Sequence, residues 1–241
     1  MSNFQSSSGF TPSRLPRYFV TATDTGAGKT EVACALLSLM ADANLHPAAF
    51  KPYESGCDDL AAPADALALK AAARTDDDLA LICPHRFRLP LAPGVAARRL
   101  RQDPPFSVTL ELFRAFDRRA LVVEGAGGLL VPIDRRRDVI DLVATLRLPV
   151  VLVARAGLGT LNHTGLSLQA LAARKLAVRA VVLSRSTPAS DPSEKDNAAL
   201  LAERHRVPVL GPVPYLPHPT RRRAAFRRAL RALVLAKLRP R

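Results

Sequence analysis

Cysteine is scarce in this sequence and long apolar runs are missing, and each lack excludes a class of protein. The three cysteines, Cys34, Cys57 and Cys83, lie far apart without C-x-x-C spacing, which argues against a disulfide framework or a zinc site. We expect buried, unreactive thiols in a reducing cytoplasm. No apolar stretch approaches the roughly 18 residues of a membrane-spanning helix, so we expect a soluble protein.

The N-terminal stretch lacks the apolar segment of a signal peptide. Residues 1–16 are rich in serine, and we expect a disordered lead-in there. Residues 17–241 show no fixed-period repeat and no domain boundary. That length suits one hydrophobic core, so we expect a single domain.

Acidic residues are missing from residues 221–241, which hold eight Arg and one Lys of a chain whose net charge is +14. The spacing of Phe226, Leu230, Leu233, Val234 and Lys237 predicts an amphipathic helix. Such a helix could pack its apolar stripe on the domain or bind nucleic acid or an anionic surface. We favour packing, and we expect neither a nucleic-acid nor a membrane partner.

Short β-rich apolar runs alternate with helical patterns along the chain. The predicted strands cover 17–23, 48–53, 121–127, 149–155, 180–184 and 207–214. The predicted helices cover 29–42, 65–73, 107–119, 138–146, 161–176 and 194–205. This alternation predicts an α/β fold with a mostly parallel sheet flanked by helices on both faces. The Pro-rich segment 89–105 interrupts it and is a candidate functional loop or lid.

The stretch TATDTGAGKT, residues 21–30, resembles a phosphate-binding loop but has Thr23 where the usual template has its first glycine. An apolar strand precedes it and a helical pattern opens at Lys29, which is the context such a loop requires. Its backbone N–H groups would face an anion, Lys29 would neutralise phosphate oxygens, and Thr30 would reach Mg²⁺. We therefore predict a P-loop NTPase-like fold.

A second acidic position, Glu124, ends the apolar part of another predicted strand, LVVEGAGG, residues 121–128. The carboxyl end of a parallel strand would bring Glu124 beside the phosphate loop, where its carboxylate is a second candidate magnesium ligand. Gly125, Gly127 and Gly128 would let backbone amides approach a substrate or the phosphates. The alternative is an ordinary strand that ends in a glycine-rich turn.

The segment AAFKPYESG, residues 48–56, puts Lys51 and Ser55 just past a third strand. Lys51 would be a second cation near the phosphates, because the carboxyl ends of parallel strands share one edge of the sheet. The alternative is a solvated lysine at a strand end.

Together these motifs resemble the dethiobiotin synthetase family. The resemblance runs from Arg17 to Pro217 and rests on their order and spacing rather than on any one of them. The segments are TDTGAGKT, KPYESG, ADALAL, PLAPGVAA, LVVEGAGGLLVPI, LPVVLVARAGLGTLNHTGLSLQAL and LGPVPYLP.

The resemblance implies ATP-dependent closure of the ureido ring of dethiobiotin from 7,8-diaminopelargonic acid and CO₂, with Mg²⁺. One amine takes up CO₂ as a carbamate, and the γ-phosphoryl group passes to a carbamate oxygen. The second amine then attacks this carbamic-phosphoric anhydride and releases phosphate. The resemblance also implies a homodimer with substrate bound at the interface.

The resemblance assigns roles to individual residues. Lys29 and Lys51 would be catalytic, with Lys51 holding the carbamate, and Thr30, Asp65 and Glu124 would bind Mg²⁺. Asp65 could also cap the helix that it begins. The implied nucleotide-binding residues are Gly26, Ala27, Gly28, Lys29, Thr30, Glu31, Asp65, Glu124, Gly125, Ala126, Gly127, Ser184, Arg185, Pro214, Tyr215 and Leu216. The implied substrate contacts are Thr25, Ser55, Gly159, Thr160, Leu161 and Asn162; the last four would receive the substrate carboxylate across the dimer.

Two departures from the family pattern concern the nucleotide. Gly26 stands where many relatives have a polar side chain in the phosphate loop, and Ser184-Arg185 stands where the family often has Asn-Asp beside adenine. Serine offers fewer paired donors and acceptors than asparagine, so we expect ATP with a looser base preference. His163 is expected to be structural.

The arginine-rich tail prompts a second hypothesis, a partition-type or regulatory ATPase that binds DNA or a protein partner. Such proteins commonly have an extra lysine near the start of the phosphate loop and an aspartate after the second metal strand. This chain has Thr23-Asp24 and Glu124 there, which disfavours that reading. An amide-forming synthetase of the cobyrinate type would need a glutaminase domain, for which 241 residues leave no room.

Overall fold

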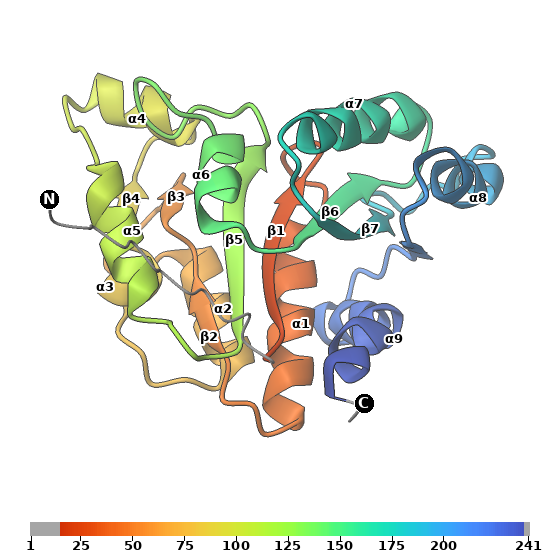
Figure 1. Ribbon diagram of the computed structural model, residues 1–241, viewed down its shortest axis with the longest axis horizontal. Coiled ribbons are helices and arrows are strands. Elements are labelled where there is room, and N and C mark those ends of the chain that lie inside the picture. The colour runs from red at the N-terminus through yellow and green to blue at the C-terminus, as the bar shows by residue number, and fades with distance from the viewer. Residues whose placement is uncertain (1–14, 239–241) are drawn as a thin grey trace, which may run out of the picture.

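The computed structural model describes residues 15–238 (Figure 1). The expected lead-in, residues 1–16, therefore lies almost wholly outside the described residues, as does the side chain of Lys237. Between residues 15 and 238, no helix has both the length and the apolar character needed to cross a bilayer.

A six-stranded sheet forms the centre of the molecule. Its spatial order is β2-β5-β1-β6-β7-β8, and each neighbouring pair is parallel. The strands are β1 (Arg17–Ala22), β2 (Ala48–Phe50), β5 (Leu121–Gly128), β6 (Val150–Arg155), β7 (Val178–Ser184) and β8 (Val209–Val213). Each of the six predicted strands is present, and the predicted fold class is confirmed.

Helices cover both faces of the sheet because successive strand residues point to opposite sides. Tyr18 and Val20 of β1 join one buried apolar cluster, whereas Phe19 joins the other. On the first face lie α1 (Lys29–Asp42), α2 (Ala64–Ala73) and α9 (Pro219–Leu238). On the second lie α5 (Phe106–Arg114), α6 (Val139–Leu146), α7 (Thr160–Ala173) and α8 (Glu194–His205). The result is a three-layer α/β structure with two cores.

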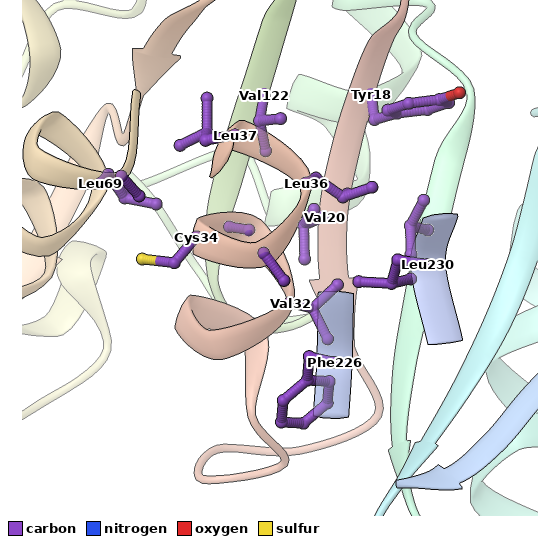
Figure 2. Close-up of a cluster of buried hydrophobic side chains, with 14 of the residues drawn as sticks. Tyr18, Val20, Val32, Cys34, Leu36, Leu37, Leu69, Val122, Phe226 and Leu230 are labelled. Atoms are coloured by element: carbon purple, nitrogen blue, oxygen red, sulfur yellow. The ribbon is translucent and has the colours of Figure 1, made fainter. Parts of the chain in front are cut away.

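The arginine-rich helix α9 packs beside α1, and Figure 2 shows their shared core. Phe226, Leu230, Leu233 and Val234 are all buried. The Tyr18 hydroxyl also donates a 2.8 Å hydrogen bond to the Leu233 carbonyl. The predicted apolar stripe is thus confirmed for these four residues, and it belongs to the main core.

A small second sheet was not predicted. Strands β3 (Tyr53–Ser55) and β4 (His85–Phe87) pair in parallel. Two short helices were also missed, α3 (Leu79–Ile82) and α4 (Pro93–Arg99). The last of these lies inside the Pro-rich segment, where Pro93 occupies the first helical position that proline tolerates.

Two predicted helices end earlier than their patterns suggested. After α5 the chain tightens into i→i−3 hydrogen bonds at Ala115 and Phe116, and the Phe116 ring packs 5.4 Å from Phe50. After α7, Lys175 adopts a left-handed φ of 54°, which stops the helix. Side-chain packing therefore sets the end of α5, and a left-handed backbone sets the end of α7. The apolar periodicity of the sequence reveals neither.

Candidate active site

The phosphate loop, residues 23–28, joins β1 to α1 at the carboxyl edge of the sheet. Gly26 and Gly28 take the left-handed φ values of 74° and 103° that glycine favours. Thr23 does not take a left-handed φ, so its position does not require the template's glycine, and its backbone N–H donates to the Val153 carbonyl at 2.9 Å. Gly28 caps α1 without a side chain, which leaves the first-turn N–H groups available to an anion.

A cleft of about 480 Å³ opens beside this loop and brings together residues from distant parts of the sequence. Of the predicted site residues, it is lined by Thr25, Gly26, Gly28, Lys29, Thr30, Glu31, Lys51, Ser55, Asp65, Glu124, Ala126 and Gly127. The other lining residues are Tyr53, Glu54, Pro90, Leu91, Ala92, Pro93 and Val131. The carboxyl ends of β1, β5 and β2 therefore meet at one site, as the parallel topology requires.

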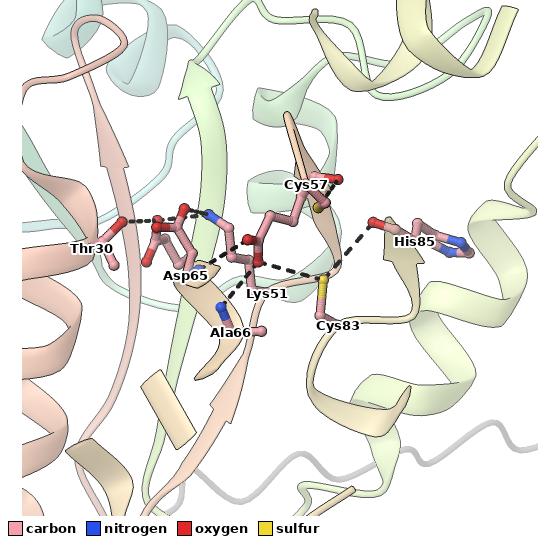
Figure 3. A network of polar contacts seen from close by, with 9 residues as sticks. Thr30, Lys51, Cys57, Asp65, Ala66, Cys83 and His85 are labelled. Atoms are coloured by element: carbon pink, nitrogen blue, oxygen red, sulfur yellow. Dashed lines mark hydrogen bonds and ion pairs between the residues drawn. The ribbon is translucent and has the colours of Figure 1, made fainter. Parts of the chain in front are cut away.

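Lys51 is the centre of a buried ionic network in this cleft (Figure 3). Its side chain is almost inaccessible, and its ammonium lies 2.7 Å from Glu124 Oε1 and 3.0 Å from Asp65 Oδ2. The Thr30 hydroxyl donates to the same Glu124 oxygen at 2.9 Å. The alternative of a solvated strand-end lysine is therefore wrong for Lys51.

Burial and the neighbouring carboxylates shift the pKa of each cleft lysine in opposite directions, and the balance differs between Lys29 and Lys51. Burial lowers the pKa of Lys29, and the Glu124 carboxylate only partly offsets this effect. Burial would also lower the pKa of Lys51, but Glu124 and Asp65 outweigh it and raise that pKa above its ordinary value. Conversely, burial would raise the pKa of Asp65, but the Lys51 ammonium holds it below the usual range. Lys51 is therefore a fixed cation rather than a proton acceptor.

The cleft offers oxygen ligands that fit a magnesium ion. Glu124 Oε2 is buried and accepts no hydrogen bond from the described residues, so one carboxylate oxygen has an unused lone pair. Thr30 and Asp65 place a hydroxyl and a second carboxylate next to it. Magnesium is typically held by one or two carboxylates together with substrate phosphates and water, and these three side chains match that requirement.

Sequence comparisons identify the family. A family model described as an AAA domain matches residues 16–223. An ATP-dependent dethiobiotin synthetase from Anaeromyxobacter dehalogenans (strain 2CP-C) is 46% identical over 223 residues, which cover 91% of this chain and 97% of that enzyme. The chain belongs to the dethiobiotin synthetase family. Another synthetase of this name, from Thermodesulfovibrio yellowstonii, is 40% identical over 83% of this chain and 88% of its own length.

These relatives confirm the family predicted from the motifs, and the regulatory-ATPase alternative is not favoured. Among solved structures, the signal recognition particle receptor FtsY from Elizabethkingia anophelis aligns with a TM-score of 0.43 and 17% identity. That alignment covers 88% of this chain and 63% of the receptor. The assignment to the synthetase family rests on the relatives above.

Glu54 is a site residue that the sequence analysis missed. Its buried carboxylate accepts hydrogen bonds from the backbone N–H groups of Asp65 at 2.9 Å and Ala66 at 3.0 Å. Glu54 therefore caps α2 from the neighbouring strand β3, whereas Asp65 lies within the first turn and pairs with Lys51. The alternative that Asp65 caps the helix is corrected. Nothing in the segment KPYESG indicates that Glu54 caps a helix elsewhere in the chain.

The Pro-rich segment forms one wall of the cleft through residues 90–93. A backbone hydrogen bond holds this wall in place: the Gly94 N–H donates to the Pro132 carbonyl at 2.8 Å. A Cβ atom on Gly94 would stand 2.8 Å from the Asp134 carbonyl oxygen, so only glycine fits this close approach. The segment borders the site as predicted, and whether it closes over a substrate stays a prediction.

The residues expected beside the base lie on the other side of the phosphate loop. The Ser184 hydroxyl stands 3.3 Å from the position of a Cβ on Gly28. Arg185 forms an ion pair at 2.5 Å with Glu194 of α8, so its guanidinium is committed to structure. Glu31 pairs with Arg222 of α9 at 3.4 Å. Pro214, Tyr215 and Leu216 follow β8 and do not line the 480 Å³ cleft.

The segment expected to receive the substrate carboxylate, residues 159–162, does not line that cleft either. The Thr160 side chain is buried and shares a 3.1 Å hydrogen bond with Thr164, whereas Asn162 is exposed. His163 and Thr25 line a second hollow of about 490 Å³ over α7. Thr25 and Val131 line both this hollow and the cleft.

The three cysteines are free and buried, as predicted. Burial raises the pKa of Cys34 to about 12, and it also raises the pKa of Cys57 and Cys83 above the ordinary value. Their thiols therefore stay protonated and unreactive near neutral pH.

Proposed function

We propose that this chain catalyses the ATP-dependent closure of the ureido ring of dethiobiotin from 7,8-diaminopelargonic acid and CO₂. The observation that carries the proposal is the position of Lys51. A buried ammonium, held between Glu124 and Asp65, shares one cleft with Lys29 and Thr30 of the phosphate loop. A nucleotide phosphate and a second anion can both be neutralised in this cleft.

The acceptor of the phosphoryl group is an anion, so repulsion between acceptor and triphosphate is the main obstacle. CO₂ adds to one substrate amine, a proton is lost, and the resulting carbamate oxygen attacks the γ-phosphorus as the bond to ADP breaks. Lys51 would hold the carbamate and Lys29 the transferring phosphoryl group, so that catalysis comes from positioning and charge. The raised pKa of Lys51 keeps it cationic throughout.

The magnesium ion would be held by Thr30, Asp65 and Glu124, and when bound it supplies positive charge that neutralises phosphate oxygens. The Lys51 ammonium contacts both the Glu124 and the Asp65 carboxylate. The chain's own charge thus positions two of the proposed magnesium ligands.

Ring closure requires the second amine to attack the carbonyl carbon of the carbamic-phosphoric anhydride. A carbon–nitrogen bond forms, the carbon–oxygen bond to phosphate breaks, and the amine loses a proton. Water would compete for the same carbon. The apolar wall of Leu91, Ala92, Pro93 and Val131 suits this step because it limits the access of water.

A homodimer with substrate at the interface is the assembly we propose. Leu130 and Leu166, which line the α7 hollow, are 70% and 58% exposed, and Leu158, which lies just before α7, is 87% exposed. Exposed apolar surface of this kind marks contact sites. Residues 159–162 lie on the same side, where they could receive the carboxylate of a substrate bound to a partner. A cytoplasmic location fits the three free thiols.

Phosphate release tests the reaction directly. With ATP, Mg²⁺ and bicarbonate, we expect the purified protein to release phosphate only when the diamine is added, and to form dethiobiotin in equal amount by mass spectrometry. Phosphate release that ignores the diamine but increases with DNA would instead support a regulatory ATPase.

The dimer is tested by light scattering after gel filtration. Replacing the exposed Leu166 by Glu should shift the protein from dimer to monomer and raise the KM for the diamine. Replacing Leu200, which is exposed on α8, should leave both quantities unchanged. A wild-type monomer would contradict the proposed assembly.

A further inference from the structure

The sheet order separates the two ends of the proposed nucleotide site. The ionic cleft uses residues that follow β1, β5 and β2, on one side of the phosphate loop. A triphosphate that points its γ end into this cleft must extend its nucleoside the other way, over the start of α1 toward β7 and β8. The segment that follows β8, residues 214–217, lies at that end.

Few hydrogen bonds fix the conformation of this segment, whose Leu216 side chain packs against the first apolar cluster. Pro214 and Pro217 have no N–H group to donate, and the segment belongs to neither a helix nor a strand. In the described part of the chain, the hydrogen bonds to its carbonyls come from Arg222 of α9: Nε donates to Leu216 O at 2.8 Å and Nη2 to Pro217 O at 3.2 Å.

The same guanidinium reaches the phosphate-loop helix. Arg222 Nη1 lies 3.4 Å from Glu31 Oε1, and Glu31 is in the first turn of α1. The guanidinium carbon also lies 6.0 Å from the Tyr215 ring centre, within reach of a cation–π contact. One planar group thus joins α9, residues 214–217 and the helix that begins at the phosphate loop.

We propose that Arg222 is a positioning residue for the nucleoside end of the nucleotide site. It fixes residues 214–217 relative to the first turn of α1, so that a base and a triphosphate can bind at the same time. Lysine cannot replace it, because an ammonium lacks the planar, forked donors that reach two carbonyls and a carboxylate together. The inference rests on the proposed use of ATP, but it is independent of the diamine.

A pair of ligands separates this role from a general effect on the fold. ATP carries both a base and phosphates, whereas inorganic tripolyphosphate carries phosphates alone. For Arg222→Gln and Arg222→Lys, we expect the Kd of ATP, measured by calorimetry with Mg²⁺, to rise about tenfold, since small misplacement of a binding group is costly. The Kd of tripolyphosphate should change less than twofold. In turnover, KM for ATP should rise while kcat at saturation is kept.

Arg227→Gln is the matched control. Arg227 lies on the same helix but pairs with Asp42 at the far end of α1, and we expect it to leave both dissociation constants unchanged. Equal weakening of ATP and tripolyphosphate by the Arg222 variants would overturn the proposal, as would no weakening of ATP. If Arg222→Gln fails to fold, Arg222→Lys decides the test, because its Kd for ATP should rise relative to its Kd for tripolyphosphate. Because binding is measured without diamine, failure of the proposed reaction would be seen separately.

Discussion

At the scale of single residues, the site depends on a lysine whose charge is set by its surroundings. Burial would lower the pKa of Lys51, and two neighbouring carboxylates reverse that tendency. A cation held in this way can bind an anionic acceptor without titrating during the reaction. The proposed carbamate chemistry needs this fixed charge more than it needs a base.

Replacing Lys51 by Gln should separate catalysis from nucleotide binding. Gln can still donate to Glu124 but carries no charge, so we expect turnover to fall about 100-fold or more while the Kd of ATP changes by less than about threefold. Steady-state kinetics and calorimetry measure the two quantities. Lys195→Gln, at an exposed lysine, is the control, and an unchanged rate for Lys51→Gln would remove Lys51 from the mechanism.

His85 should make stability depend on pH. Burial lowers its pKa to about 4 from the ordinary 6.5, while its ring stacks on Tyr53 at 5.0 Å and shares a 3.0 Å hydrogen bond with Thr109. The unfolded chain therefore binds this proton more tightly, so stability is lost as pH falls from 6.5 toward 4. From pH 7 to 5 we expect a loss of about 1.5 kcal/mol from this residue.

Chemical denaturation of the wild type and His85→Asn at both pH values checks this expectation. Carboxylates that titrate in the same range are common to both proteins and cancel in the comparison. The pH-dependent loss should be smaller in the variant by about 1.5 kcal/mol. Equal pH dependence in the two proteins would show that His85 is not held neutral.

At the scale of elements, the hydrophobic pattern of the sequence predicted the helices and strands that are long and have a clear apolar period. The six central strands and α1, whose bounds match the prediction, carry strong patterns because parallel strands and their covering helices are buried. The pair β3 and β4 has three residues in each strand, too few for a period to show. Helix α4 was hidden because prolines usually signal a loop.

The candidate site was predictable where motifs are local. The phosphate loop, Lys51, Asp65 and Glu124 line the cleft as expected. Glu54 and Arg222 were not found, because their roles depend on contacts with backbone from other elements, and neither residue stands in a pattern that indicates such a contact. The Arg185 side chain is committed to Glu194, a pairing that is equally invisible in sequence.

The junction between α4 and residues 132–134 should be sensitive to one added methyl group. In Gly94→Ala the new Cβ would stand 2.8 Å from a backbone oxygen, and relieving that clash should cost about 1–3 kcal/mol. We expect a melting temperature lower by about 2–4 °C per kcal/mol, together with a raised KM for the diamine, since the cleft wall must shift.

The matched control is Gly165→Ala in the interior of α7. Its nearest neighbour would be 3.6 Å away, an ordinary contact, and alanine favours a helix over glycine by roughly 0.5–1 kcal/mol. Calorimetric scans should therefore show this variant at or above the wild-type melting temperature. A Gly94→Ala protein that melts with the wild type would mean that α4 tolerates displacement.

At the scale of the whole molecule, α9 behaves as part of the domain rather than as an attached basic tail. Its apolar stripe lies in the same core as α1 and β1, and the Tyr18–Leu233 hydrogen bond joins residues 215 positions apart. The positive charge of this segment is thus carried by a helix that the fold requires.

Truncation of Leu230 should destabilise the entire domain. Leu230 is fully buried, and Leu230→Ala should cost about 2–5 kcal/mol. Arg231→Ala, at an exposed neighbour, should change stability by less than about 0.5 kcal/mol. Unfolding followed by both circular dichroism and tyrosine fluorescence should shift together in Leu230→Ala. An unshifted transition would mean that α9 folds apart from the sheet.

The contact between α1 and α9 also has a consequence for protein synthesis. A ribosome makes α1 early and α9 only after every strand of the central sheet. Until then the nascent chain exposes the surface that Phe226 and Leu230 later cover, and it has to avoid aggregation in that interval. Translation speed and chaperone supply should therefore influence the yield of this enzyme more than that of proteins whose cores close early in the message.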